Sequence, residues 1–103
     1  MAPRSFGPWM SLEAALEAAP RTAGVFQVRT EAVRAYPRGR SAMAHYGSGE
    51  DLHAAVAAWG EGESDGSLRV RLMTELGGKT HAEVLDGLVV RFVDRFGVAP
   101  RRD

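Results

Sequence analysis

The stretch GVFQVRTEAVRAYPRGRSAMAHYG, residues 24–47, decides the fold of this chain. It begins with Gly24-Val25-Phe26 and ends with His45-Tyr46-Gly47, so each end places two large residues beside a glycine. Apolar residues alternate near both ends with the two-residue period of a β-strand. We therefore predict two strands that frame an arginine-rich connection. We expect the other elements to cover this ribbon and any functional surface to lie on it.

The residues around the ribbon predict the elements that cover it. A hydroxyl residue stands before each of three amphipathic segments, as expected of helix caps: Ser11, Ser48 and Thr80. The predicted helices cover residues 12–19, 50–59 and 81–96, and the predicted strands cover residues 25–29, 33–36, 42–46 and 68–73. This order indicates an α+β fold: a small, mostly antiparallel sheet of three or four strands flanked by helices. We expect one domain over residues 1–103, with a covering helix in 10–20 and a core in 21–100.

The composition excludes several classes of protein. With 45% apolar and 25% charged residues, the chain is typical of a globular domain rather than a disordered one. It has no cysteine, and therefore no disulfide or thiolate metal site. No apolar run is long enough to span a membrane, and no signal-like segment is visible, so we expect a cytoplasmic protein and no membrane partner. The formal net charge of zero argues against strong non-specific binding to DNA.

The order of elements and motifs resembles the GIY-YIG nuclease family. Gly24-Val25-Phe26 is similar to the first motif of the family, and His45-Tyr46-Gly47 is similar to the second. Residues 48–52 resemble the segment that opens the first catalytic helix. Residues 83–100 resemble the acidic helix of the family and a tail found in some members. The resemblance covers residues 21–100 and implies a nuclease-like domain that acts on or binds nucleic acid.

The resemblance also implies where the site would lie and how it has changed. In the family, two tyrosines, a helix arginine and a metal-binding glutamate surround the scissile phosphate. Phe26 and His45 stand at the tyrosine positions of this chain, Ala55 at the arginine position and Asp86 at the glutamate position. Because the loss of one charge stabiliser typically costs ~10²–10³ in rate, we predict that metal-dependent DNA cleavage is absent or very slow. We assign no metal site and no cofactor.

The residues that remain suggest an acid–base pair. A neutral imidazole can accept a proton near pH 7, so we predict His45 as a catalytic base facing the last helix. Its acidic partner would be Asp86 or Glu83, and Phe26 would form an apolar wall. The alternatives are a structural role for His45 and a capping role for Glu83. We expect Tyr46, on the opposite pleat from His45, to lie in the core.

Other polar residues of the ribbon are candidates for substrate binding. Arginine suits phosphate and carboxylate recognition, although a solvated ribbon face explains the same pattern. The predicted substrate-binding residues are Phe26, Arg29, Arg34, Arg40 and Ser48. We also expect Gly87, unusual within a helix, to mark a place of close packing.

The sequence is compatible with three functional classes. The first is a GIY-YIG-like protein that acts on or binds nucleic acid. The second is an enzyme that uses the same cleft for acid–base chemistry on a small molecule, and the third is a non-catalytic interaction domain. The sequence leaves undecided whether the protein is an enzyme, and it does not give an oligomeric state.

Overall fold

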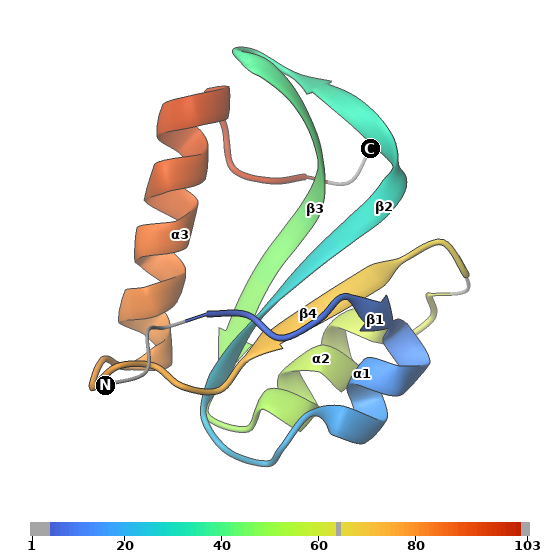
Figure 1. Cartoon of the computed structure of the whole chain (residues 1–103), viewed down its shortest axis with the longest axis vertical. Helices are drawn as coiled ribbons and strands as arrows, with labels where there is room; N and C mark the ends of the chain where they lie inside the picture. Colours follow the sequence, from blue (N-terminus) through green and yellow to red (C-terminus); the bar gives the residue numbers. More distant parts are fainter. Residues whose placement is uncertain (1–4, 64, 102–103) are drawn as a thin grey trace.

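The computed structural model describes residues 5–63 and 65–101, so residues 1–4, 64 and 102–103 of the predicted domain lie outside it. Within these residues the fold is α+β, with a four-stranded antiparallel sheet in the order β1-β4-β2-β3 and three helices (Figure 1). This confirms the predicted fold class. The elements in chain order are β1 (Met10–Ser11), α1 (Leu12–Ala18), β2 (Gly24–Tyr36), β3 (Gly39–Gly49), α2 (Leu52–Gly60), β4 (Arg69–Met73) and α3 (His81–Phe96).

The predicted ribbon is the β2–β3 hairpin. Its strands pair from Gly24 opposite Gly49 to Tyr36 opposite Gly39, and the predicted strands 25–29 and 33–36 are both part of β2. Phe26 lies opposite Gly47, and its ring occupies the space beside this glycine. A Cβ atom at residue 47 would approach the Phe26 ring to 2.5 Å. Glycine is therefore required in the second motif because the aromatic residue of the first motif fills the place of its side chain.

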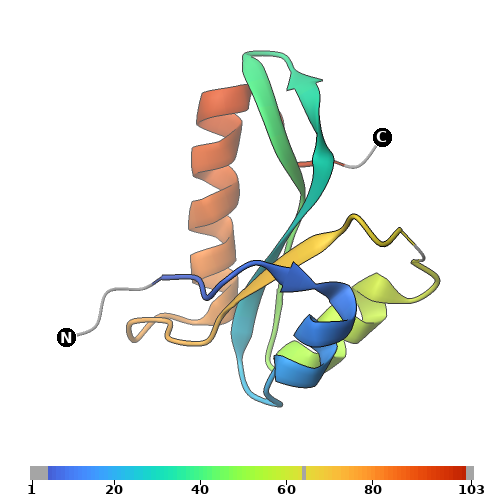
Figure 2. The same cartoon turned by 45° about the vertical axis from the view of Figure 1, so that its right-hand side comes forward.

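The two faces of the sheet are covered by different helices (Figures 1 and 2). On one face, α1 and α2 enclose a core that includes Phe26, Val28 and Leu52, all of which are buried. On the other face, Val25 of β2 packs with Met73 and with α3. Successive residues of β2 thus contribute to opposite faces, as the period of a strand requires.

The far half of the hairpin is held by α3 rather than by a further strand. β4 pairs with β2 only over Val25–Arg29, and beyond this region the hairpin continues alongside α3 (Figure 1). There the Tyr36 ring packs on Phe92 at 5.1 Å and on Phe96 at 5.6 Å between centroids. These contacts fix the position of α3 against the hairpin.

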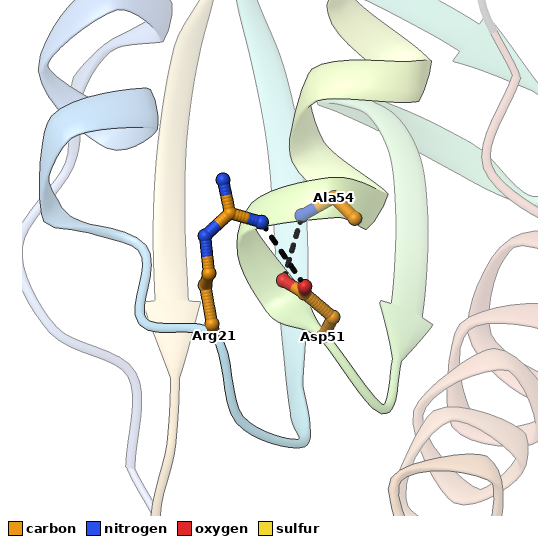
Figure 3. A network of polar contacts seen from close by, with 3 residues as sticks. All are labelled: Arg21, Asp51 and Ala54. Atoms are coloured by element: carbon orange, nitrogen blue, oxygen red, sulfur yellow. Dashed lines mark hydrogen bonds and ion pairs between the residues drawn. The ribbon is translucent and has the colours of Figure 1, made fainter.

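Two of the three predicted helix caps are confirmed, and one is wrong. Ser11 accepts the Ala14 N–H at 3.1 Å, and the Thr80 capping box has both of its hydrogen bonds. Ser48 does not cap α2, because it is still part of β3. Asp51 caps α2 instead: it accepts the Ala54 N–H at 3.0 Å and also forms an exposed ion pair with Arg21 at 3.2 Å (Figure 3).

The expectation that something packs closely against Gly87 is also wrong. Apart from the adjacent backbone of α3 itself, a Cβ atom at this residue would meet no described atom within 4 Å. The glycine lies inside a regular helix, where it is less favourable than alanine by roughly 1 kcal/mol. The structure gives no packing reason for this glycine.

Candidate functional site

His45 lies on the α2 face of the sheet and forms part of an aromatic stack. Its ring is nearly parallel to the Trp59 ring of α2, with 5.4 Å between centroids and an interplanar angle of 20°. The Phe26 ring lies 5.6 Å away on another side. Burial in this apolar setting lowers the pKa of His45, because it disfavours the imidazolium. The histidine is therefore half-buried and biased towards its neutral form.

The prediction that His45 faces the last helix is wrong. Its neighbour Tyr46 faces α3, with 5.6 Å between the centroids of the Tyr46 and Phe92 rings, so His45 has to point to the other side of the strand. This places Tyr46 on the opposite pleat, as expected, but Tyr46 is half-buried and lines a hollow, so the expectation that it lies in the core is wrong. Both predicted acids belong to α3, which covers the opposite face of the sheet from α2 (Figures 1 and 2), whereas the His45 ring stacks on Trp59 of α2.

The predicted acids do not form a site with His45. Asp86 is exposed on α3. Glu83 is exposed as well, and its carboxylate accepts the Thr80 N–H at 3.0 Å. The Thr80 backbone and side-chain hydrogen bonds lower the pKa of Glu83. Its capping role, the alternative left open by the sequence, is thus present in the structure.

The apolar wall and the metal ligands that the predicted cleft would need are also not assembled around His45. Phe26 is only 2% exposed, because it fills the space beside Gly47, and so it cannot wall an open cleft. The divalent ion that the family resemblance implies finds no ligand set: among the described residues, no three His, Cys, Asp or Glu side chains gather. Asp86 therefore lacks the partners that a protein-held metal ion needs.

The opposite face carries a different constellation, a hollow between β3 and α3. Its volume is about 440 Å³, and it is lined by Arg40 of β3 and by Arg91 and Arg95, which are one turn apart on α3. No aspartate or glutamate is among the described residues that line it. The full lining is Arg40, Ser41, Met43, Tyr46, Leu88, Arg91, Phe92, Arg95 and Phe96. We call this space the arginine hollow.

Tyr46 places a phenol in the arginine hollow. Burial raises its pKa, while the positive charges of Arg71 and Arg91 act in the opposite direction. Because burial is the larger effect, the phenol keeps its proton and remains a hydrogen-bond donor. The arginine hollow thus offers only positive charge and neutral polar groups above an aromatic floor.

A second hollow of about 430 Å³ adjoins the first one, and the two share Leu88 and Arg91. Here Arg71 of β4 donates from Nε to Gln27 Oε1 at 2.7 Å. The Arg71 guanidinium also lies 4.6 Å from the Phe6 ring centroid and 4.5 Å from that of Trp9. Ser5, Met73 and Val84 complete the lining. We call this space the glutamine hollow.

The remaining predicted binding residues lie elsewhere. Arg29 lies over the Trp9 ring at 4.3 Å, and its hollow also contains Glu31. The Nε and Nη1 atoms of Arg34 are buried and have no hydrogen-bond partner among the residues that the structure describes. Ser48 Oγ lies 2.9 Å from His81 Nδ1, at the start of α3. Of the predicted substrate-binding residues, only Arg40 lines the arginine hollow.

Comparison with known proteins does not extend this description. No protein-family model, curated protein or solved structure matches the chain. Within the described residues, no helix combines the length and the apolar character needed to cross a bilayer.

Proposed function

We propose that this chain is a GIY-YIG-like domain that binds single-stranded nucleic acid and does not cleave it. The observation that carries the proposal is the arginine hollow, which three arginines from two elements line together with three aromatic residues. The adjacent pairing of the two glycine motifs supports the resemblance, since Phe26 and Gly47 are direct partners.

The chemistry of the hollow suits a strand with exposed bases. Arginine binds phosphate with two parallel hydrogen bonds, and aromatic side chains stack on bases of any sequence. Tyr46 and Phe96 are half-buried, so part of each ring reaches the hollow. A duplex hides the faces of its bases, and would use only the arginines. We therefore expect a preference for single strands over duplexes.

The zero net charge of the chain does not oppose this proposal. Arg40, Arg91 and Arg95 are exposed around one hollow, while the acidic residues of the 61–65 loop follow α2. Local field, rather than total charge, attracts an anion to a concave site. A net charge of zero disfavours non-specific binding to DNA, but it is compatible with a local binding site for an anion.

The other face explains why binding would occur without cleavage. On this face Phe26 is buried and Ala55 stands where the resemblance implies an arginine; Asp86 lies on α3 instead, and no group of three metal-ligating side chains gathers among the described residues. Neither Phe26 nor Ala55 supplies a group that would stabilise the charge that develops on a phosphate during hydrolysis. The nuclease chemistry of the family is thus not expected here.

A small anionic molecule is a second candidate ligand. The 440 Å³ of the arginine hollow fall within the usual range of small-molecule sites, about 300–1,000 Å³. The two candidates differ in how affinity depends on ligand length. If the ligand is a strand, affinity should rise with each added nucleotide until the arginine hollow is filled. If the site binds a small molecule, a longer strand should bind no more tightly.

The test is fluorescence anisotropy with labelled single strands of increasing length and with a duplex of matched sequence. We expect tighter binding of the single strand and several-fold weaker binding by an Arg91→Gln, Arg95→Gln double variant. Arg21→Gln is the control, because it removes an arginine on the α2 side whose ion pair among the described residues is with Asp51. Equal binding by all three proteins, or no binding of any strand, would overturn the proposal.

A further inference from the structure

The glutamine hollow has the properties of a base-reading site, an inference that rests on the proposed function. Gln27 is 3% exposed and lies on β2 between two strands. Its Oε1 atom accepts from Arg71 Nε at 2.7 Å, so the amide and the guanidinium hold each other in place. Two rings of the N-terminal segment, Phe6 and Trp9, pack on the same guanidinium. The polar groups of this hollow are thus pre-positioned by neighbours.

Arg71 has no acidic partner to neutralise it. Among the described residues, no carboxylate lies within ion-pair distance of its guanidinium. Arg71 is half-buried, and burial lowers its pKa, but an arginine side chain stays charged in proteins. A partly desolvated cation without a counter-ion favours a ligand that brings hydrogen-bond acceptors.

The free polar groups of the hollow are mainly donors. With Gln27 Oε1 and Arg71 Nε bound to each other, the Gln27 amide nitrogen and the two terminal nitrogens of Arg71 remain. Arg91 adds further donors, and the Ser5 hydroxyl is able to donate or accept. The apolar lining from Phe6, Met73, Val84 and Leu88 provides a surface for a flat ring.

We propose that the glutamine hollow binds a guanine base of the strand. Guanine presents two neighbouring acceptors, O6 and N7, on one edge. Adenine presents one acceptor beside a donor, and cytosine presents a donor at the equivalent place, so both would face donors with a donor. Arg91 is shared by the two hollows, which allows a phosphate in the arginine hollow and the adjoining base in the glutamine hollow.

The test is competition for a labelled single strand by GMP, AMP, CMP, UMP and inorganic phosphate, each added to the full chain. We expect GMP to compete at least about fivefold better than AMP, the lower end of what one bidentate base contact provides. Arg71→Lys keeps the charge and removes the planar fork, so it should abolish this preference. Arg95→Lys, in the arginine hollow, is the matched control and should weaken all four nucleotides alike.

The outcomes separate this inference from the proposed function. If the strand binds but GMP and AMP compete equally, or phosphate competes as well as GMP, the inference is wrong and the proposed function stands. If no strand binds, the proposed function itself fails. A GMP preference that survives Arg71→Lys would place base reading elsewhere and overturn the assignment. The ranking on the unaltered protein decides the question even where Arg71→Lys fails to fold.

Discussion

Replacement of His45 by alanine tests the aromatic stack on the α2 face. The ring packs against Trp59 at 5.4 Å and Phe26 at 5.6 Å. An aromatic pair contributes ~0.5–1.5 kcal/mol beyond its buried area, so the loss of two pairs should cost ~1–3 kcal/mol. For a domain of this size, that corresponds to a fall in melting temperature of roughly 5–20 °C. His53→Ala, a change on α2 without a ring contact among the described residues, should stay within about 0.5 kcal/mol of the parent.

The pH dependence of stability provides a second measurement on the same variant. The pKa of His45 is lowered in the folded state from its usual value of 6.5. The unfolded chain therefore binds the proton more tightly, and His45 contributes stability that is present above pH 6.5 and is lost as the pH falls through the folded pKa. We expect the parent melting temperature to fall between pH 7 and pH 5, and His45→Ala to show less of this fall.

Melts monitored by circular dichroism at several pH values carry out this test. A His45→Ala protein that melts like the parent at every pH would refute the packing argument. If the same protein also lost binding of the labelled strand, His45 would be a functional group, as the sequence alone suggested. A destabilised variant that still binds the strand when folded would confirm the structural role.

Three further predictions concern two glycine positions and the expected lack of metal-dependent DNA cleavage. Gly47→Ala should destabilise the fold by ~1–3 kcal/mol in denaturant melts, because its Cβ would approach the Phe26 ring to 2.5 Å, whereas Gly66→Ala, with open space around it, should not. Gly87→Ala should raise stability by up to about 1 kcal/mol in the same melts, since no described atom beyond the adjacent helix backbone lies within 4 Å of the added carbon. Purified protein with magnesium or manganese should not nick supercoiled plasmid within hours on an agarose gel; nicking that disappears in Asp86→Ala would contradict this.

Much of the fold could be predicted because its signals are local. Alternation over 25–29 and the capping box at Thr80 each specify an element without reference to the rest of the chain. β1 could not be predicted, because two residues are too few to show a period. The cap of α2 could not be predicted from the local sequence, because Ser48 and Asp51 are both good capping residues and only the length of β3 decides between them.

The candidate site was less predictable because it depends on which helix covers which face. The two-residue period correctly separates His45 from Tyr46, but it does not say which of them meets α3. The arginine hollow joins Arg40 to Arg91, which are far apart in the sequence. The spacing of Arg91 and Arg95, one helical turn apart, was a visible sign of a shared face. That these two arginines and Tyr46 line the same hollow is known only from the three-dimensional structure.

The salt dependence of strand binding tests the central claim most directly. Three arginines in contact with phosphates of a single strand predict a slope of log affinity against log salt of about −2, from ~0.7 per phosphate. Arg91→Gln should reduce the magnitude of that slope by about 0.7, while Arg21→Gln, on the other side of the sheet, should leave it unchanged. Equal slopes for the two variants, or binding that does not depend on salt, would contradict a nucleic-acid site in the arginine hollow.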